Sequence, residues 1–268
     1  MPHPPGRRAL AAALAALALA AALPARAGDV LDRVRASGTL RVCIWPDYYG
    51  ISWRNPRTDE LEGIDIDLSA AFAADLGVRR ELVNSSFARL VEDLSSDRCD
   101  VSMHAIGITE ARQRHLRFSR PYLQSDLYGV TTRANRLVRQ WDDIDRPGVR
   151  VAVQAGTVME PTMREALRHA ELVVVAPPAT REGELEAGRV DVFMTDYPYS
   201  RRLLDRADWA RLVAPPRPFH VVPYAYAVRP GDDAWLQQVD RFVAAIQSDG
   251  RLAQAARRHG LAEIAVLK

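Results

Sequence analysis

The segment His104-Ala105-Ile106-Gly107-Ile108-Thr109-Glu110-Ala111-Arg112-Gln113 decides how the rest of the chain is interpreted. Residues 100–103, just before it, predict a buried strand that ends in a short loop. Thr109 is a good N-cap and Glu110 suits a first turn, which predicts a helix there. Strand and helix bring Arg112 to the edge of what we expect to be the first of two lobes. A guanidinium there can hold a carboxylate through two parallel hydrogen bonds, so the segment predicts an anion site; an ordinary surface arginine is the alternative.

The N-terminal residues have the features of an export signal. Arg7 and Arg8 precede the apolar run 9–23, and Ala25-Arg26-Ala27 supplies the small residues that a signal peptidase recognises. We expect cleavage after Ala27, with the Sec route favoured over the twin-arginine route. The run is too short and too alanine-rich for a convincing membrane anchor, so we expect a soluble periplasmic protein.

Cleavage also changes the charge of the chain. The full sequence has a formal net charge of +2, and residues 1–27 contain three arginines and no acid, so the mature chain carries −1. Its basic and acidic residues are interspersed, which argues against nucleic acid as a partner. The mature length of about 240 residues allows one large domain or two ordinary ones.

Predicted strands and helices alternate along the mature chain, which is typical of a mainly parallel sheet covered by helices. The polar stretch 133–146 interrupts the alternation, and a second series begins with the strand 149–153. The strand 224–228 and the two amphipathic helices after it have no partner in that series, so we expect them to return to the first. The predicted parts are a signal peptide (1–27), lobe 1 (28–132 and 224–268) and lobe 2 (133–223), with two crossovers between the lobes.

The two cysteines each belong to a predicted strand. Cys43 ends the strand 40–44 and Cys99 begins the strand 99–101. If these strands are neighbours in a parallel sheet, a disulfide is reachable, and an exported protein favours it. Closing that loop stabilises a fold by about 4 kcal/mol in the chain-entropy treatment. We expect the disulfide; two buried free thiols are the alternative.

Motifs of several enzyme classes are absent from the sequence. There is no Gly-x-Gly-x-x-Gly, no Gly-x-x-x-x-Gly-Lys and no Gly-x-Ser-x-Gly. The six histidines have no metal-ligand spacing, and only His104 lies near the expected anion site. We therefore expect no metal, no cofactor and no catalytic residue.

Other motifs identify a family. They are Leu40-Arg41-Val42, Gly63-Ile64-Asp65-Ile66-Asp67-Leu68, Ile108-Thr109 with Arg112, Phe118-Ser119 with Pro121-Tyr122, Gly156-Thr157 and Met194-Thr195-Asp196. Together they resemble the family 3 solute-binding proteins of polar amino-acid ABC importers, over nearly all of the mature chain. The resemblance implies an α/β, two-lobed type II periplasmic-binding-protein fold that captures a small amino acid or related carboxylate and delivers it to an inner-membrane ABC permease. We expect a monomer.

The resemblance also implies roles for individual residues. Arg112 would hold the α-carboxylate of the ligand, and Thr157 would close on the same group with backbone N–H donors. Asp196 would take the α-ammonium, although it could simply cap the helix that begins near Tyr197. A zwitterion needs one fixed cation and one fixed anion, and placing them on opposite lobes makes closure depend on the ligand.

Aromatic residues are expected to cover the body of the ligand. By the same resemblance, Phe87 and Tyr48 would do so, and an aromatic face adds about 0.5 to 2 kcal/mol for a cationic group. Phe87 could instead be a core residue, and Tyr48 is preferred only weakly to Tyr49. Asp47 is an additional acid in this loop and could select a basic side chain.

Two positions depart from the family pattern. Gly107 stands where many members carry a Ser or Thr hydroxyl that binds the carboxylate, and Val158 stands where a polar residue is common. The carboxylate then depends on Arg112 and on backbone groups. The ligand is therefore expected to be an unusual amino acid or another small carboxylate.

An enzyme of the same fold is an alternative. The segments Pro46-Asp47-Tyr48, Arg112-Gln113-Arg114 and Ile144-Asp145-Arg146-Pro147-Gly148-Val149 resemble periplasmic cyclohexadienyl dehydratases. Dehydration needs a general acid on the leaving hydroxyl. By this resemblance Tyr199 stands in place of the dehydratase glutamate and Leu127 in place of its lysine, which argues against catalysis. A sensing or accessory binding protein is a third alternative.

Overall fold

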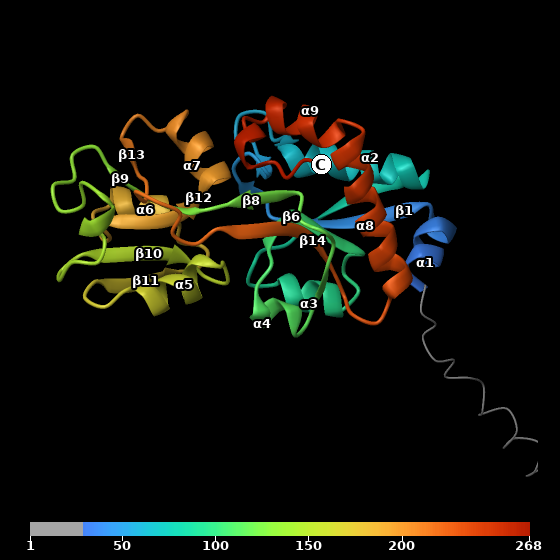
Figure 1. Cartoon of the computed structure of the whole chain (residues 1–268), viewed down its shortest axis with the longest axis horizontal. Helices are drawn as coiled ribbons and strands as arrows, with labels where there is room; N and C mark the ends of the chain where they lie inside the picture. Colours follow the sequence, from blue (N-terminus) through green and yellow to red (C-terminus); the bar gives the residue numbers. More distant parts are fainter. Residues whose placement is uncertain (1–28) are drawn as a thin grey trace, which may run out of the picture.

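Two β-sheets, each covered by helices, organise residues 29–268, which this computed structural model describes (Figure 1). The predicted signal peptide and its cleavage site lie outside the described residues. The fold is α/β and two-lobed, as the sequence predicts, and the chain crosses between the lobes twice. Among residues 29–268, no helix combines the length and apolar character needed to cross a bilayer.

Lobe 1 is built on a six-stranded sheet with the order β5-β1-β6-β14-β7, in which β8 also pairs with β14. The strands are β1 (Thr39–Ile44), β5 (Arg79–Asn84), β6 (Val101–Gly107), β7 (Arg117–Phe118), β8 (Leu123–Ser125) and β14 (Val222–Val228). The helices of this lobe are α1 (Asp29–Ser37), α2 (Ile64–Leu76), α3 (Leu90–Ser95), α4 (Glu110–Gln113), α8 (Asp233–Ser248), α9 (Arg251–Arg258) and the 3-10 helix η2 (Ala262–Ile264). The C-terminal helices α8 and α9 lie over α1 and α2, so the end of the chain packs on lobe 1 (Figure 1).

Lobe 2 is built on a five-stranded sheet with the order β11-β10-β12-β9-β13. Its strands are β9 (Leu127–Thr132), β10 (Arg150–Gln154), β11 (Glu171–Val175), β12 (Val192–Asp196) and β13 (Ala210–Val213). Its helices are α5 (Met159–Ala166), α6 (Arg181–Glu186), α7 (Tyr197–Leu204) and the 3-10 helix η1 (Trp141–Asp143).

The sheets are mixed rather than mainly parallel. In lobe 2, β10, β11 and β12 are parallel, but β9 runs antiparallel to both β12 and β13. This pairing places residues 127–132 in the second sheet, whereas the sequence-based division assigned them to lobe 1. Likewise β14 begins at Val222, two residues before the expected return. The differences arise because each crossover strand is assigned by its hydrogen bonds: β9 pairs with β12 and β13 of lobe 2, and β14 pairs with β6 of lobe 1.

The two crossovers are tied together at Asp126, which separates β8 from β9. Its carboxylate accepts hydrogen bonds from the backbone N–H groups of Phe219 (2.9 Å) and His220 (2.7 Å), which precede β14. It also accepts one from Leu127 N at 2.8 Å. One side chain thus joins both connections between the lobes.

Strand β6 continues to Gly107, beyond the loop that the sequence predicts after residue 103. Ala105 has a φ of 50°, which is unusual for a residue with a side chain. Its N–H donates to the buried carboxylate of Asp65 (3.0 Å), which also accepts from the hydroxyls of Tyr122 (2.6 Å) and Tyr226 (2.9 Å). Asp65 therefore holds the irregular part of β6 that leads to Gly107.

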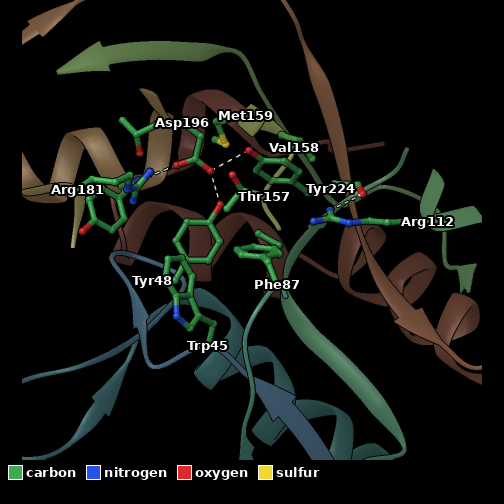
Figure 2. A pocket seen from close by; sticks show the side chains of 14 residues that line it. Trp45, Tyr48, Phe87, Arg112, Thr157, Val158, Met159, Arg181, Asp196 and Tyr224 are labelled. Carbon is green, nitrogen blue, oxygen red and sulfur yellow. Dashed lines mark hydrogen bonds between the residues drawn. The ribbon is translucent and has the colours of Figure 1, made fainter. Parts of the chain in front are cut away.

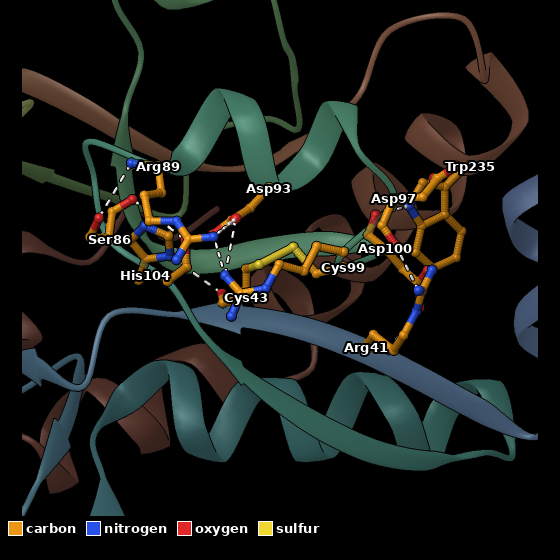
Figure 3. Close-up of a disulfide and its surroundings, with 12 residues drawn as sticks. Arg41, Cys43, Ser86, Arg89, Asp93, Asp97, Cys99, Asp100, His104 and Trp235 are labelled. Atoms are coloured by element: carbon orange, nitrogen blue, oxygen red, sulfur yellow. Dashed lines mark hydrogen bonds and ion pairs between the residues drawn. A yellow bond between two sulfur atoms is a disulfide. The ribbon is translucent and has the colours of Figure 1, made fainter.

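The disulfide between Cys43 and Cys99 is present, as predicted (Figure 3). It joins β1 to the segment just before β6. The strands β1 and β6 are parallel neighbours. Beside it, the buried carboxylate of Asp100 accepts hydrogen bonds from Arg41 at 2.7 Å, and the Asp100 carbonyl accepts one from the indole N–H of Trp235 at 2.8 Å. The covalent bond and these polar contacts fix the start of the strand that carries the site.

A small third sheet extends lobe 1 toward lobe 2. Its strands are β2 (Asp47–Tyr48), β3 (Ser52–Arg54) and β4 (Leu61–Glu62). Tyr49 stacks on Tyr199 of α7 with ring centroids 4.6 Å apart, and the guanidinium of Arg206 lies 3.9 Å from the ring centroid of Trp53. The lobes therefore touch outside the central cleft as well as within it.

Candidate functional site

A pocket of about 350 Å³, part of it open to solvent, lies between the two lobes (Figure 2). Both lobes contribute to its lining, and most of the lining side chains are aromatic or aliphatic. The lining residues are Trp45, Tyr48, Phe87, Ala105, Gly107, Arg112, Tyr224 from lobe 1 and Thr157, Val158, Met159, Arg181, Thr195, Asp196, Tyr199 from lobe 2.

Arg112 lies at one end of this pocket, on the short helix α4. Thr109 caps the helix, and its hydroxyl accepts a hydrogen bond from Arg112 N at 3.3 Å, as the sequence predicts. The guanidinium donates to the carbonyl of Gly107 in its own lobe and to that of Gly156 in lobe 2, both at 2.9 Å. Arg112 thus contacts both lobes.

The charge of Arg112 is buried and has no acidic partner among residues 29–268. Arg112 is only 9% exposed, and no carboxylate of the described chain lies within 4.0 Å of its guanidinium. Burial lowers the pKa of Arg112 to about 10, with the hydroxyls of Tyr224 and Tyr48 opposing that shift. The guanidinium also lies 5.3 Å from the ring centroid of Phe87. A buried cation with neutral partners attracts an anion.

Asp196 lies at the opposite end of the pocket, where β12 becomes α7 (Figure 2). It caps α7, because its Oδ1 accepts from Tyr199 N at 3.2 Å. Its Oδ2 accepts hydrogen bonds from the hydroxyls of Tyr48 and of Tyr224, the latter at 2.8 Å. Burial raises the pKa of Asp196, which these three hydrogen bonds oppose. Asp196 therefore lines the pocket and also caps a helix, and its role toward an α-ammonium group stays a prediction.

Thr157 lines the pocket, but its polar groups face its own turn. Its hydroxyl donates to the carbonyl of Gln154 at 2.8 Å, and its N–H donates to the same oxygen at 3.2 Å. The Thr157 N–H therefore donates within its own turn, whereas the sequence analysis expects it to donate to a ligand.

Gly107 and Val158 face each other across the lobes, which relates the two departures from the family pattern. A Cβ built on Gly107 would lie 2.8 Å from Val158 Cγ1 and 2.9 Å from Val222 Cγ1. The valine methyl groups occupy the place that a serine or threonine side chain would need. The glycine in one lobe thus accommodates the valine in the other.

Three aromatic residues form one wall of the pocket. The ring centroids of Trp45, Tyr48 and Phe87 lie 5.4 to 5.7 Å from one another, with tilted or edge-on geometry. His104 lies behind Phe87 with ring centroids 5.0 Å apart, and burial lowers the pKa of His104 to about 3. The histidine is therefore neutral and supports the wall from behind.

The structure separates Asp47 and Tyr49 from the central pocket. Asp47 is exposed and lines a neighbouring cavity of about 910 Å³, open to solvent, together with Glu182 of lobe 2. Tyr49 points toward α7 and Trp53 instead. Of the two adjacent tyrosines, Tyr48 is the one in the pocket.

Among the residues of the site that sequence reasoning missed, Arg181, Tyr224 and Trp45 have the largest side chains. Arg181 is 4% exposed; it donates to the Met194 carbonyl at 2.8 Å, and its guanidinium lies 4.7 Å from the ring centroid of Tyr199. Tyr224 and Trp45 also line the pocket. Arg181 follows the N-cap Thr180 at the start of a short polar helix, a pattern that indicates a solvent-exposed arginine. Only the fold buries it.

Within residues 29–268, no group of three or more His, Cys, Asp or Glu side chains is arranged to hold a metal ion. The charged groups that line the central pocket are Arg112, Arg181 and Asp196. Such a site suits the binding of a small organic ion.

Comparison with known proteins gives a consistent result. The family model "Bacterial extracellular solute-binding proteins, family 3" matches residues 40–262. The cyclohexadienyl dehydratase of Pseudomonas aeruginosa is 33% identical over 255 residues, which cover 94% of this chain and 94% of that protein. The L-cystine-binding protein TcyJ of Escherichia coli is 26% identical over 251 residues, 92% of each chain.

A solved structure shows the same architecture. The ancestral amino acid-binding protein AncCDT-1, a precursor of cyclohexadienyl dehydratase, superposes with a TM-score of 0.77 at 29% identity, over 85% of this chain and 98% of that one. These similarities confirm the resemblance that the sequence motifs indicate. The chain belongs to the bacterial extracellular solute-binding proteins, family 3.

Proposed function

We propose that this protein is a periplasmic binding protein that captures a small amino acid or related carboxylate between its lobes, as a monomer, and delivers it to an ABC importer. The observation that carries the proposal is the buried guanidinium of Arg112, which reaches both lobes and has no acidic partner in the described chain. A carboxylate there gains charge-assisted hydrogen bonds and compensates a buried charge.

The lining supports capture of one small molecule. Aromatic and aliphatic side chains surround Arg112 and Asp196, which stand at opposite ends of the pocket. Such a lining favours a ligand with one charged end and a largely apolar body. Since both lobes supply the lining, a ligand that touches both favours the closed arrangement.

Ligand binding is tested by a thermal-shift screen over amino acids and small organic acids. A true ligand raises the melting temperature because it binds only the folded state. Arg112→Ala should abolish the shift. The matched control Arg114→Ala should keep it, since Arg114 is exposed, pairs with Glu110 at 2.7 Å and does not line the pocket. An unchanged shift in Arg112→Ala would remove this residue from the site.

Delivery to an importer is a separate part of the proposal. Cells that lack the gene should lose high-affinity uptake of the ligand found in the screen, and the protein should be released with the periplasmic fraction by osmotic shock. Uptake that does not depend on the gene would point instead to a sensing or accessory role.

A dehydratase is the second candidate, because the Pseudomonas aeruginosa enzyme is 33% identical over nearly the whole chain. Tyr199, in the position of the dehydratase glutamate, is buried and its pKa is raised well above the usual value, so it is a weak acid. Leu127, in the position of the lysine, is fully buried and apolar. We therefore propose binding without catalysis.

Incubation with prephenate or arogenate decides between the two candidates. We expect no aromatic product above the uncatalysed rate. Formation of product that Arg112→Ala abolishes would establish the enzyme instead.

A further inference from the structure

The central pocket has more fixed positive than negative charge. Its charged lining residues are two arginines, Arg112 and Arg181, and one acid, Asp196. Each of these three residues is at most 9% exposed. With all three ionised the lining carries +1. A ligand with a net charge of −1 neutralises it, whereas a zwitterion leaves one buried charge uncompensated.

Asp196 already accepts three hydrogen bonds, which leaves one acceptor position, on Oδ1, for an ammonium group. Its Oδ2 already accepts from two hydroxyls, of Tyr48 and Tyr224, and its Oδ1 accepts from Tyr199 N. Two of these donors come from lobe 1 and the third from lobe 2. An ammonium group would have to displace a tyrosine hydroxyl to reach Oδ2.

The backbone acceptors around Arg112 are also in use. The carbonyl oxygens of Gly107 and Gly156 each accept from its guanidinium at 2.9 Å. An ammonium group brings three N–H donors. Beside Arg112 the side chains of Phe87 and Val158 offer apolar surface, and the Thr157 hydroxyl donates to the Gln154 carbonyl. Burial of an ammonium without acceptors is costly, whereas a keto or unsubstituted carbon needs none.

Arg181 provides the second cation. It approaches from lobe 2, and its Nε is buried without a hydrogen-bond partner in the described chain. Its other contacts are with the Met194 carbonyl and the faces of Tyr199 and Phe193. Arg181 balances Asp196, which leaves Arg112 as the cation that the ligand must neutralise.

We propose that the ligand is a monocarboxylate without an α-ammonium group, with an apolar or aromatic body, rather than a zwitterionic amino acid. The inference rests on the proposed function, because it assumes that the cleft binds a carboxylate at Arg112. In this arrangement Asp196 positions the hydroxyls of Tyr48 and Tyr224 and makes no hydrogen bond to the ligand.

The test compares matched ligands on the unaltered protein. Each apolar and aromatic amino acid is paired with its α-keto acid and with its deaminated acid, for example leucine with α-ketoisocaproate and isocaproate, in thermal-shift and calorimetric titrations. We expect the acids without the ammonium to bind at least about tenfold more tightly than the amino acid. An amino acid that binds as tightly as, or more tightly than, its counterparts overturns the inference.

Asp196→Asn provides an independent readout. Asparagine can cap α7 through its Oδ1, and its amide NH2 can donate to the oxygens of the tyrosine hydroxyls, so the fold should be kept. Loss of a buried negative charge near an anionic ligand should tighten carboxylate binding, by about threefold or more. If Asp196 instead holds an ammonium, the variant loses amino acid affinity by about a hundredfold or more, which contradicts the inference. If no carboxylate of either kind gives an Arg112-dependent shift, the proposed function itself fails.

Discussion

Arg112 in lobe 1 donates from Nη2 to the carbonyl oxygen of Gly156 in lobe 2 at 2.9 Å. Gly156 has a φ of +76°, and a Cβ on it would lie 2.8 Å from both the N and the Cα of Ala88 in lobe 1. The backbones of the two lobes therefore meet where the proposed anion site closes, and the contact requires a residue without a side chain.

We predict that Gly156→Ala blocks closure. The new methyl group meets backbone atoms of lobe 1, which cannot move aside as a flexible side chain would. Ligand affinity, measured by calorimetry, should fall by about 2 kcal/mol or more, a factor of about 30.

The matched control is Gly148→Ala in the same lobe. Gly148 has a φ of +84° but no atom within 4 Å of a built Cβ. Both variants should lose about 1 kcal/mol of folding stability from the left-handed backbone, and only Gly156→Ala should lose binding. Equal affinities in the two variants would contradict this account of closure.

A second prediction concerns the pair Gly107 and Val158. Gly107→Ser places a side chain against Val158 and Val222, so it should weaken ligand binding by about 1 to 3 kcal/mol. Val158→Ala removes one of the two opposing contacts and should restore part of that loss in the double variant. A double-mutant cycle on affinity measures the coupling, and strictly additive losses would show that the two residues do not compete for space.

Asp65 predicts a pH dependence of stability. Burial raises the pKa of Asp65 from 3.8 to about 7, with the hydroxyls of Tyr122 and Tyr226 opposing the shift. Its contribution to stability is therefore fully present below about pH 4 and is lost as the pH rises through about 7. As the pH rises from 5 to 8, the raised pKa of Asp65 should lower the free energy of unfolding by about 3 kcal/mol.

The comparison with Asp65→Asn isolates that contribution. Asparagine cannot ionise, so urea unfolding at pH 5 and pH 8 should show a smaller decline in the variant than in the unaltered protein. Contributions from the rest of the chain are common to both proteins and cancel in the difference. Parallel declines would show that Asp65 stays ionised across this range.

Removal of the disulfide should lower stability without altering the pocket directly. Cys43 and Cys99 are 56 residues apart in sequence, and the chain-entropy treatment assigns such a loop about 4 kcal/mol. The double variant Cys43→Ala/Cys99→Ala should unfold at lower urea concentration and be insensitive to reductant. Reductant should destabilise the unaltered protein to a similar degree, and a loss below about 1 kcal/mol would contradict the treatment.

The sequence by itself determined the alternation of strands and helices, the two-lobed fold, and the family. These features depend on periodicity, caps and local motifs, such as Thr109 before α4, so they are encoded over short stretches. The reach of the disulfide also followed from strand positions, because parallel neighbours bring Cys43 and Cys99 together.

Only the tertiary structure decided what surrounds each charged group. Arg181 lies in a short polar helix and becomes a buried pocket residue because α6 packs against β12. Asp47, next to Tyr48 in sequence, lies outside the central pocket because alternate residues of β2 face opposite sides. The hydroxyls that occupy Asp196 come from residues 148 and 28 positions away, and no local pattern specifies such distant partners.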